Sequence, residues 1–234
     1  IGGANFKNKY GINNKHLNQK KLNNILNYAL KNNILQIDNA EAYDSIEEIN
    51  KFSDVLKSFR IDNKISNPKE NQHHFFNYFY QNLEKINCKQ YNIFYIHHID
   101  VLRKSYKNLL KDIFFLRDRG FINHIGVSIY EINELKKILK IFTPNYIQVP
   151  VNLLDSEFLI TKNLSFIKKN KIKIIGRSLF LQGLLLTKKE PTNLKLKNIF
   201  NHKNNIFEKN KYNLNTLELC VVPFLKNKNI DKLI

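Results

Sequence analysis

The chain alternates between short apolar runs and longer amphipathic segments along its whole length. The short runs are typical of buried strands, and the longer segments repeat their apolar residues every three or four positions, as one face of a helix does. Strands separated by helices pair in parallel, because each helix crosses over the sheet and covers its face. We therefore predict an α/β fold with a parallel sheet. The predicted strands are residues 1–4, 34–38, 59–65, 91–98, 121–127, 146–151, 172–176 and 230–234.

Predicted helices occupy most of the intervals between these strands. Pro68 lies near the start of one of them, where proline is tolerated in the first turn. Ser105 is the predicted cap of the next, which we expect to end at Gly120 because glycine readily adopts the left-handed conformation that closes a helix. A connection rich in Lys and Asn, residues 187–212, has no predicted structure. The predicted helices are residues 17–32, 46–58, 68–87, 105–120, 132–141, 159–170 and 214–225.

Two architectures are built on a parallel sheet of this kind. An open doubly wound sheet usually carries a glycine-rich phosphate turn after its first strand, and the isolated Gly2-Gly3 pair does not fit that pattern. A (β/α)8 TIM barrel fits both the eight strands and the 234 residues. We expect one barrel domain over residues 1–234, incomplete at its N- and C-terminal ends. Because the chain starts at Ile1 and stops inside the last predicted strand, we also expect it to be part of a longer protein.

Polar residues stand at the ends of three successive predicted strands. Asp38 and Lys64 end the second and third, His97 lies near the end of the fourth, and Tyr43 follows Asp38 in the next loop. In a barrel the carboxyl ends of the strands converge on one face, so these residues would meet there. A buried carboxylate needs a cation or several donors, and Lys64 can serve as that cation. Asp, Tyr, Lys and His together suit the reduction of a carbonyl group by acid catalysis.

Each of these residues also has a structural interpretation when taken alone. Asp38 can cap a helix, Tyr43 can be a half-buried aromatic at the rim, Lys64 a solvated lysine and His97 a core histidine. Their joint occurrence at matching strand ends favours the catalytic interpretation. We expect His97 rather than its neighbour His98 to face inward, since adjacent residues of a strand face opposite sides.

Six short segments resemble the aldo-keto reductase family, in the family's order and spacing. The segment IDNAEAY, residues 37–43, is similar to the family's Asp-Thr-Ala-x-x-Tyr signature. The segment RSLFLQGLL, residues 177–185, resembles the seventh strand of one bacterial branch. The other four are DNKI (62–65), YIHHID (95–100), INHIGVSIY (122–130) and IQVPVNLL (147–154).

The resemblance implies an NADP-dependent oxidoreductase that reduces a small aldehyde or ketone, with hydride passing from the nicotinamide to the carbonyl carbon. It implies that Tyr43 is the general acid. A free tyrosine has a pKa of about 10, and we expect the Lys64 ammonium to lower that value. Asp38 would keep Lys64 charged, and His97 would donate a hydrogen bond to the substrate oxygen.

The resemblance also implies a cofactor site without a Rossmann motif. Ser128 and Gln148 match the positions that hold the nicotinamide amide, and Arg177 stands where many members stack an aromatic ring on the nicotinamide. Ser178 and Phe180 lie where the loop on the pyrophosphate side begins. We expect NADPH as cofactor, with NADH left open because the family's 2′-phosphate segment would lie beyond the last residue.

Two departures from the family pattern affect the expected site. Ile129 replaces an asparagine and removes one amide contact, and Asp44 stands where glycine commonly follows the catalytic tyrosine. These departures keep open a second hypothesis, a degenerate barrel that acts as a non-catalytic binding or scaffold protein.

The net charge of +18 raises a third hypothesis, a protein that binds polyanions. The lysines, however, are spread over nearly every predicted helix, and Lys, Asn, Ile, Phe and Tyr are abundant together, as codon bias in an AT-rich genome would produce. We therefore expect no specific nucleic-acid partner. The composition, 43% hydrophobic and 12% aromatic, excludes a disordered chain.

The two cysteines and the lengths of the apolar runs bear on metal binding and on location. Cys88 and Cys220 are far apart and have no metal-ligand spacing, so we expect neither a disulfide framework nor a metal site. The sequence has no signal peptide pattern and no apolar run long enough for a membrane span. We expect a reduced, cytoplasmic setting without membrane partners, and the sequence leaves the oligomeric state open.

Overall fold

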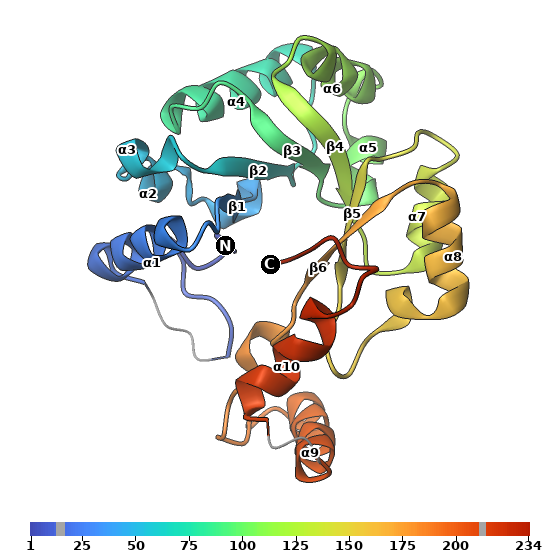
Figure 1. The fold of residues 1–234 in the computed structure, drawn as a ribbon. Helices are drawn as coiled ribbons and strands as arrows, with labels where there is room; N and C mark the ends of the chain where they lie inside the picture. Colours follow the sequence, from blue (N-terminus) through green and yellow to red (C-terminus); the bar gives the residue numbers. More distant parts are fainter. Residues whose placement is uncertain (13–16, 211–213) are drawn as a thin grey trace.

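The computed structural model of the protein describes residues 1–12, 17–210 and 214–234. Within these residues, seven strands form one sheet in chain order, and every neighbouring pair is parallel. The sheet curls around a central axis, and the helices lie outside it (Figure 1). The strands are β1 (Gln36–Asp38), β2 (Arg60–Ile65), β3 (Tyr91–Ile96), β4 (Ile122–Ser128), β5 (Tyr146–Pro150), β6 (Lys173–Arg177) and β7 (Lys232–Leu233).

The two ends of the chain occupy the two edges of this curled sheet. The Asp38 N–H donates to the carbonyl of Ile1 at 2.8 Å, and the Gly3 N–H donates to the carbonyl of Asp38 at 2.8 Å, so residues 1–3 run parallel beside β1. Gly2 lies next to Ile234, and Figure 1 shows both ends near the centre of the molecule. The prediction of an incomplete (β/α)8 barrel with parallel strands is confirmed.

Each of the seven predicted helical segments contains helix, and three of the connections contain short 3-10 turns. No helix of the described residues is both long enough and apolar enough to cross a membrane. The helices are α1 (Gln19–Lys31), α2 (Ile46–Asn50), α3 (Ser53–Leu56), α4 (Gln72–Lys85), α5 (Ile99–Lys104), α6 (Leu109–Asp118), α7 (Ile132–Ile138), α8 (Thr161–Lys169), α9 (Leu194–Glu208) and α10 (Thr216–Leu225); the turns are η1 (Glu41–Tyr43), η2 (Glu157–Leu159) and η3 (Leu181–Gly183).

Several predicted helix boundaries are wrong because other residues provide the caps. Helix α4 begins after Asn71, whose side chain accepts from the His74 N–H at 3.0 Å, rather than at Pro68. Ser105 ends α5, a helix that the sequence did not predict, and its hydroxyl accepts from the Lys69 N–H at 3.0 Å instead of capping α6.

Two predicted segments differ more widely from the structure. The single helix predicted over residues 46–58 is divided into α2 and α3, because Phe52 leaves the helical region with φ −117° and ψ 26°. The connection over residues 187–212 contains α9, which begins where the Asn193 side chain accepts from the N–H groups of Lys195 and Leu196. Residues 211 and 212 of that connection lie outside the described residues.

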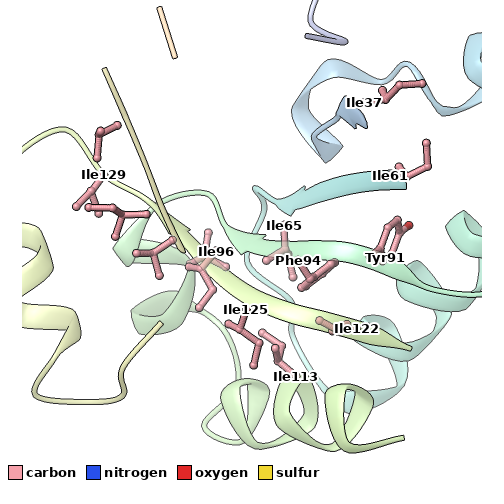
Figure 2. Close-up of a cluster of buried hydrophobic side chains, with 14 of the residues drawn as sticks. Ile37, Ile61, Ile65, Tyr91, Phe94, Ile96, Ile113, Ile122, Ile125 and Ile129 are labelled. Carbon is pink, nitrogen blue, oxygen red and sulfur yellow. The ribbon is translucent and has the colours of Figure 1, made fainter. Parts of the chain in front are cut away.

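The main hydrophobic core lies between the strands and the helices. Figure 2 shows Phe94 of β3 and Ile125 of β4 packing toward Ile113 of α6, with Ile65 of β2 beside them. These four side chains are at most 2% exposed, so this layer is closed to water. Ile129, which replaces the family's asparagine, also belongs to this core and therefore supplies packing.

The inside of the barrel combines aromatic and polar side chains. Tyr95 packs there with Ile93, Tyr146 and Ile175. Asp62 is fully buried and accepts hydrogen bonds from the Asn92 amide at 2.7 Å, from the Ile93 N–H at 3.1 Å and from the Gln36 amide. Burial raises the pKa of Asp62 to about 6, although the Asn92 and Gln36 amides oppose the shift.

We predict that Gly126→Ala destabilises the barrel. Gly126 of β4 lies opposite Tyr95 of β3, and a β-carbon at Gly126 would collide with two ring carbons of Tyr95. The expected loss in the free energy of unfolding is about 1–3 kcal/mol, as for other overpacked cores, measured by urea denaturation. In a Tyr95→Ala background the same substitution should cost much less, because the ring is absent. Equal losses in the two backgrounds would show that Tyr95 is not the obstacle.

Candidate active site

A buried ion pair joins β1 to β2 at the carboxyl ends of the strands. The Lys64 ammonium, with no exposed side-chain surface, lies 2.6 Å from Oδ2 of Asp38 and also donates to the carbonyl of Asn39 at 3.1 Å. The Gln148 amide of β5 donates to Oδ1 of Asp38 at 2.8 Å. Burial lowers the pKa of Lys64, while the Asp38 carboxylate raises it. Both oxygens of Asp38 are thus held by donors.

Tyr43 lies over this ion pair from the turn η1, which follows β1. The Lys64 ammonium is 5.3 Å from the centre of the Tyr43 ring. The next residue, Asp44, has a left-handed backbone with φ 49°, the conformation that glycine adopts most easily. The aspartate at the position where the family commonly has glycine therefore preserves the turn that presents Tyr43.

The pKa of Tyr43 shifts in the direction opposite to our expectation from the sequence. Burial raises the pKa of this phenol and the Asp38 carboxylate raises it further, while Arg177 opposes them. The Lys64 ammonium, which is paired with Asp38 at 2.6 Å, does not outweigh these effects. Tyr43 therefore holds its proton at neutral pH and is available as a hydrogen-bond donor and acid.

His97 follows β3 directly and faces Tyr43. The two rings meet edge to face, with their centres 6.4 Å apart. The His97 N–H of the backbone donates to the carbonyl of Ile65 at 3.0 Å, and the Nδ1 atom of the ring lies 2.7 Å from the hydroxyl of Ser66. His98 caps α5, and its ring stacks on that of His97 at 4.4 Å. Burial lowers the pKa of His97 to about 3, helped by Lys64 and His98, so the ring is neutral at physiological pH.

A pocket of about 540 Å³ opens over these residues, a size suited to a small-molecule ligand. Seven of the nine predicted site residues line it. Lys64 is buried beneath the pocket, and Ser128 is buried beside Gln148 without lining it. Those that line it are Asp38, Tyr43, His97, Gln148, Arg177, Ser178 and Phe180.

The model of the Aldo/keto reductase family matches residues 1–222. The chain belongs to the aldo/keto reductase family. This membership supports an oxidoreductase. A search of curated proteins found no match to this aldo/keto reductase.

Solved structures of low sequence identity share the fold of this aldo/keto reductase. The aldo-keto reductase AKR11C1 from Bacillus halodurans, in its holo form, is 14% identical with a TM-score of 0.76, over 100% of this chain and 79% of that one. The glycerol dehydrogenase AKR11B4 from Gluconobacter oxydans is 17% identical with a TM-score of 0.69, over 100% of this chain and 80% of that one.

Arg177 lies at the end of β6 on the pocket wall of this aldo/keto reductase. Its guanidinium lies 4.3 Å from the centre of the Tyr130 ring, and Nη1 donates to the Ser178 hydroxyl at 3.2 Å. The Nη2 atom is buried without a hydrogen-bond partner in the described structure. Ser178 is left-handed at φ 64°, as are Leu181 and Gln182, so a strained turn borders the pocket.

Sequence reasoning missed three residues of the site. Tyr10 and Tyr130 line the pocket from two loops, and Ser66 contacts His97. Tyr130 ends a segment that resembles the family, whereas Tyr10 lies in a polar loop that carries no pattern. Ser66 follows Lys64 by two residues, and because residues two apart in a strand face the same side, this spacing could have indicated that Ser66 belongs to the site. In the described residues, no group of three or more His, Cys, Asp and Glu side chains is placed to hold a metal ion.

We predict that His97 makes the protein sensitive to acid. The folded ring stays neutral until the pH falls to about 3, whereas the unfolded ring binds a proton near its ordinary pKa of 6.5. The unfolded state binds more protons in this window, so the free energy of unfolding falls as the pH falls. When the pH falls from about 7 to about 4.5, the free energy of unfolding of His97→Gln should decrease by about 1–2 kcal/mol less than that of the wild type, as measured by urea denaturation. His202→Gln, at an exposed site, should behave like the wild type. Equal acid losses in His97→Gln and the wild type would contradict the prediction.

Proposed function

We propose that this aldo/keto reductase reduces a small aldehyde or ketone with a nicotinamide cofactor, NADPH by preference and NADH as the alternative. The observation that carries the proposal is the position of Tyr43 and His97 on one pocket above a buried Lys64–Asp38 pair. A phenol that keeps its proton and a neutral imidazole are both donors to a carbonyl oxygen.

The four residues have distinct roles in the proposed reaction. Tyr43 gives its proton to the carbonyl oxygen as negative charge develops there, and His97 donates a hydrogen bond to the same oxygen. The Lys64 ammonium stabilises the phenolate left on Tyr43, because an adjacent cation favours the charged form. Asp38 keeps Lys64 charged and in position, since an unpaired ammonium at this depth would lose its proton.

The residues of the pocket fit a nicotinamide nucleotide. When bound, the reduced nicotinamide supplies the hydride. Gln148 uses its amide N–H on Asp38 and keeps its carbonyl oxygen for a carboxamide, with Ser128 beside it in register. Ser178 and Phe180 would hold the part toward the phosphates, and Arg177, which lines the pocket beside them, would lie near the nicotinamide.

We predict that Tyr43→Phe lowers carbonyl reduction by at least about 100-fold, the usual scale for a positioned general acid. The dissociation constant of NADPH, measured by fluorescence titration, should remain nearly unchanged, because the lost hydroxyl acts on the substrate. Turnover is followed by the absorbance of NADPH with a panel of small aldehydes. Tyr28→Phe, at an exposed site on α1, is the matched control and should retain full turnover.

Two results would contradict the proposal. Substantial residual turnover in Tyr43→Phe would remove Tyr43 from the acid role. A wild-type protein that binds NADPH and reduces no aldehyde or ketone would favour the non-catalytic binding or scaffold protein instead.

A further inference from the structure

We propose that Ser66 is a positioning residue that holds His97 in the tautomer with its proton on Nε2. The functional meaning of this inference rests on the proposed function, because a donor at Nε2 is what a carbonyl oxygen in the pocket requires. The assignment of the tautomer itself rests on hydrogen bonds of the protein alone.

Ser66 contacts the active site from the loop after β2. Its hydroxyl oxygen lies 2.7 Å from Nδ1 of His97 and accepts from the Ala42 N–H at 3.3 Å. In the described structure these are the hydrogen bonds of the Ser66 hydroxyl, and the Nδ1 contact is the hydrogen bond of the His97 ring. The hydroxyl therefore stands between the catalytic histidine and the turn that carries Tyr43.

These contacts favour Ser66 as the donor to His97. A serine hydroxyl has one proton to donate, and the Ala42 N–H occupies one of its lone pairs. Among the described residues, Nδ1 of His97 is the acceptor within hydrogen-bond distance of that proton. If Ser66 donates to Nδ1, this nitrogen carries a lone pair, and the proton of the neutral ring must be on Nε2.

The neutral state of His97 makes the tautomer decisive. A protonated imidazole would donate from both nitrogens, but burial lowers the pKa of His97 and leaves one N–H on the ring. With that N–H at Nε2, the ring donates to a carbonyl oxygen in the pocket. With the N–H at Nδ1, Nε2 would present a lone pair to the carbonyl oxygen and repel it.

The backbone around Ser66 is fixed by the same turn that presents Tyr43. The Glu41 carboxylate of η1 accepts from the N–H groups of Ser66 at 2.9 Å and Asn67 at 3.0 Å, and it forms an ion pair with Lys69. Glu41 and Lys69 are largely buried, which strengthens this pairing relative to an exposed one. Ser66 is thus held in place between His97 and the turn that carries Tyr43.

The test reads the tautomer directly. Long-range 1H–15N correlation spectra of protein labelled with 15N-histidine distinguish a protonated ring nitrogen from one with a lone pair, and His97→Gln identifies the His97 signals. In the wild type at neutral pH we expect Nε2 protonated and Nδ1 in the shift range of a hydrogen-bonded acceptor. In Ser66→Ala the Nδ1 signal should move to the range of a free lone pair, with a detectable fraction of the other tautomer. Ser66→Thr keeps the hydroxyl and should restore the wild-type signals.

Turnover gives the second readout. Ser66→Ala should lower kcat about five- to tenfold, the scale of one hydrogen bond, with an unchanged dissociation constant for NADPH. Ser66→Thr should recover most of kcat, and Ser58→Ala, at an exposed serine, should match the wild type. A merely structural role for Ser66 would not move the Nδ1 signal selectively.

Two outcomes would overturn the inference. One is a wild-type ring protonated on Nδ1, and the other is a Ser66→Ala variant whose His97 signals and kcat both match the wild type. The spectra do not depend on turnover, so a protein that reduces no carbonyl would count against the proposed function while the spectra still decide the tautomer.

Discussion

The ion pair between Lys64 and Asp38 is the interaction on which the site depends. Each charge is buried, and neither is stable there without the other, because an isolated ion in the interior loses its hydration without compensation. The Asn39 carbonyl accepts a further hydrogen bond from Lys64, and the Gln148 amide donates one to Asp38. The result is a polar junction of β1, β2 and β5 inside the barrel, with the pocket directly above it.

The position of the donors follows from this junction. Tyr43 and His97 follow β1 and β3, the two strands that flank β2 and its Lys64, and their ring centres are 6.4 Å apart. Burial favours the uncharged form of both residues: it raises the pKa of the Tyr43 phenol and lowers the pKa of the His97 imidazole. A low dielectric around the pocket thus selects the uncharged forms of two residues that would donate to a carbonyl oxygen.

The boundaries of the helices show where local sequence reasoning fails. Pro68 and Ser105 are both compatible with helix starts, yet Asn71 and Asn108 precede the actual first turns. Ser105 is engaged by the backbone of Lys69, a residue 36 positions away, and no local pattern reveals that competition. The break between α2 and α3 and the formation of α9 are likewise outcomes of packing and capping that outweigh weak propensities.

The sequence by itself determined the alternation of strands and helices, the parallel barrel and the residues at the strand ends, because the period of apolar residues and the polarity of strand ends are local properties. The tertiary structure decided which of these side chains share a pocket. It brought Gln148 to Asp38 across 110 residues, left Ser128 behind the pocket wall and reversed the expected shift in the pKa of Tyr43. It also placed Ser66 against His97. Burial, pairing of charges and the direction of a hydrogen bond depend on what surrounds a group in space, and the order of residues along the chain does not contain that information.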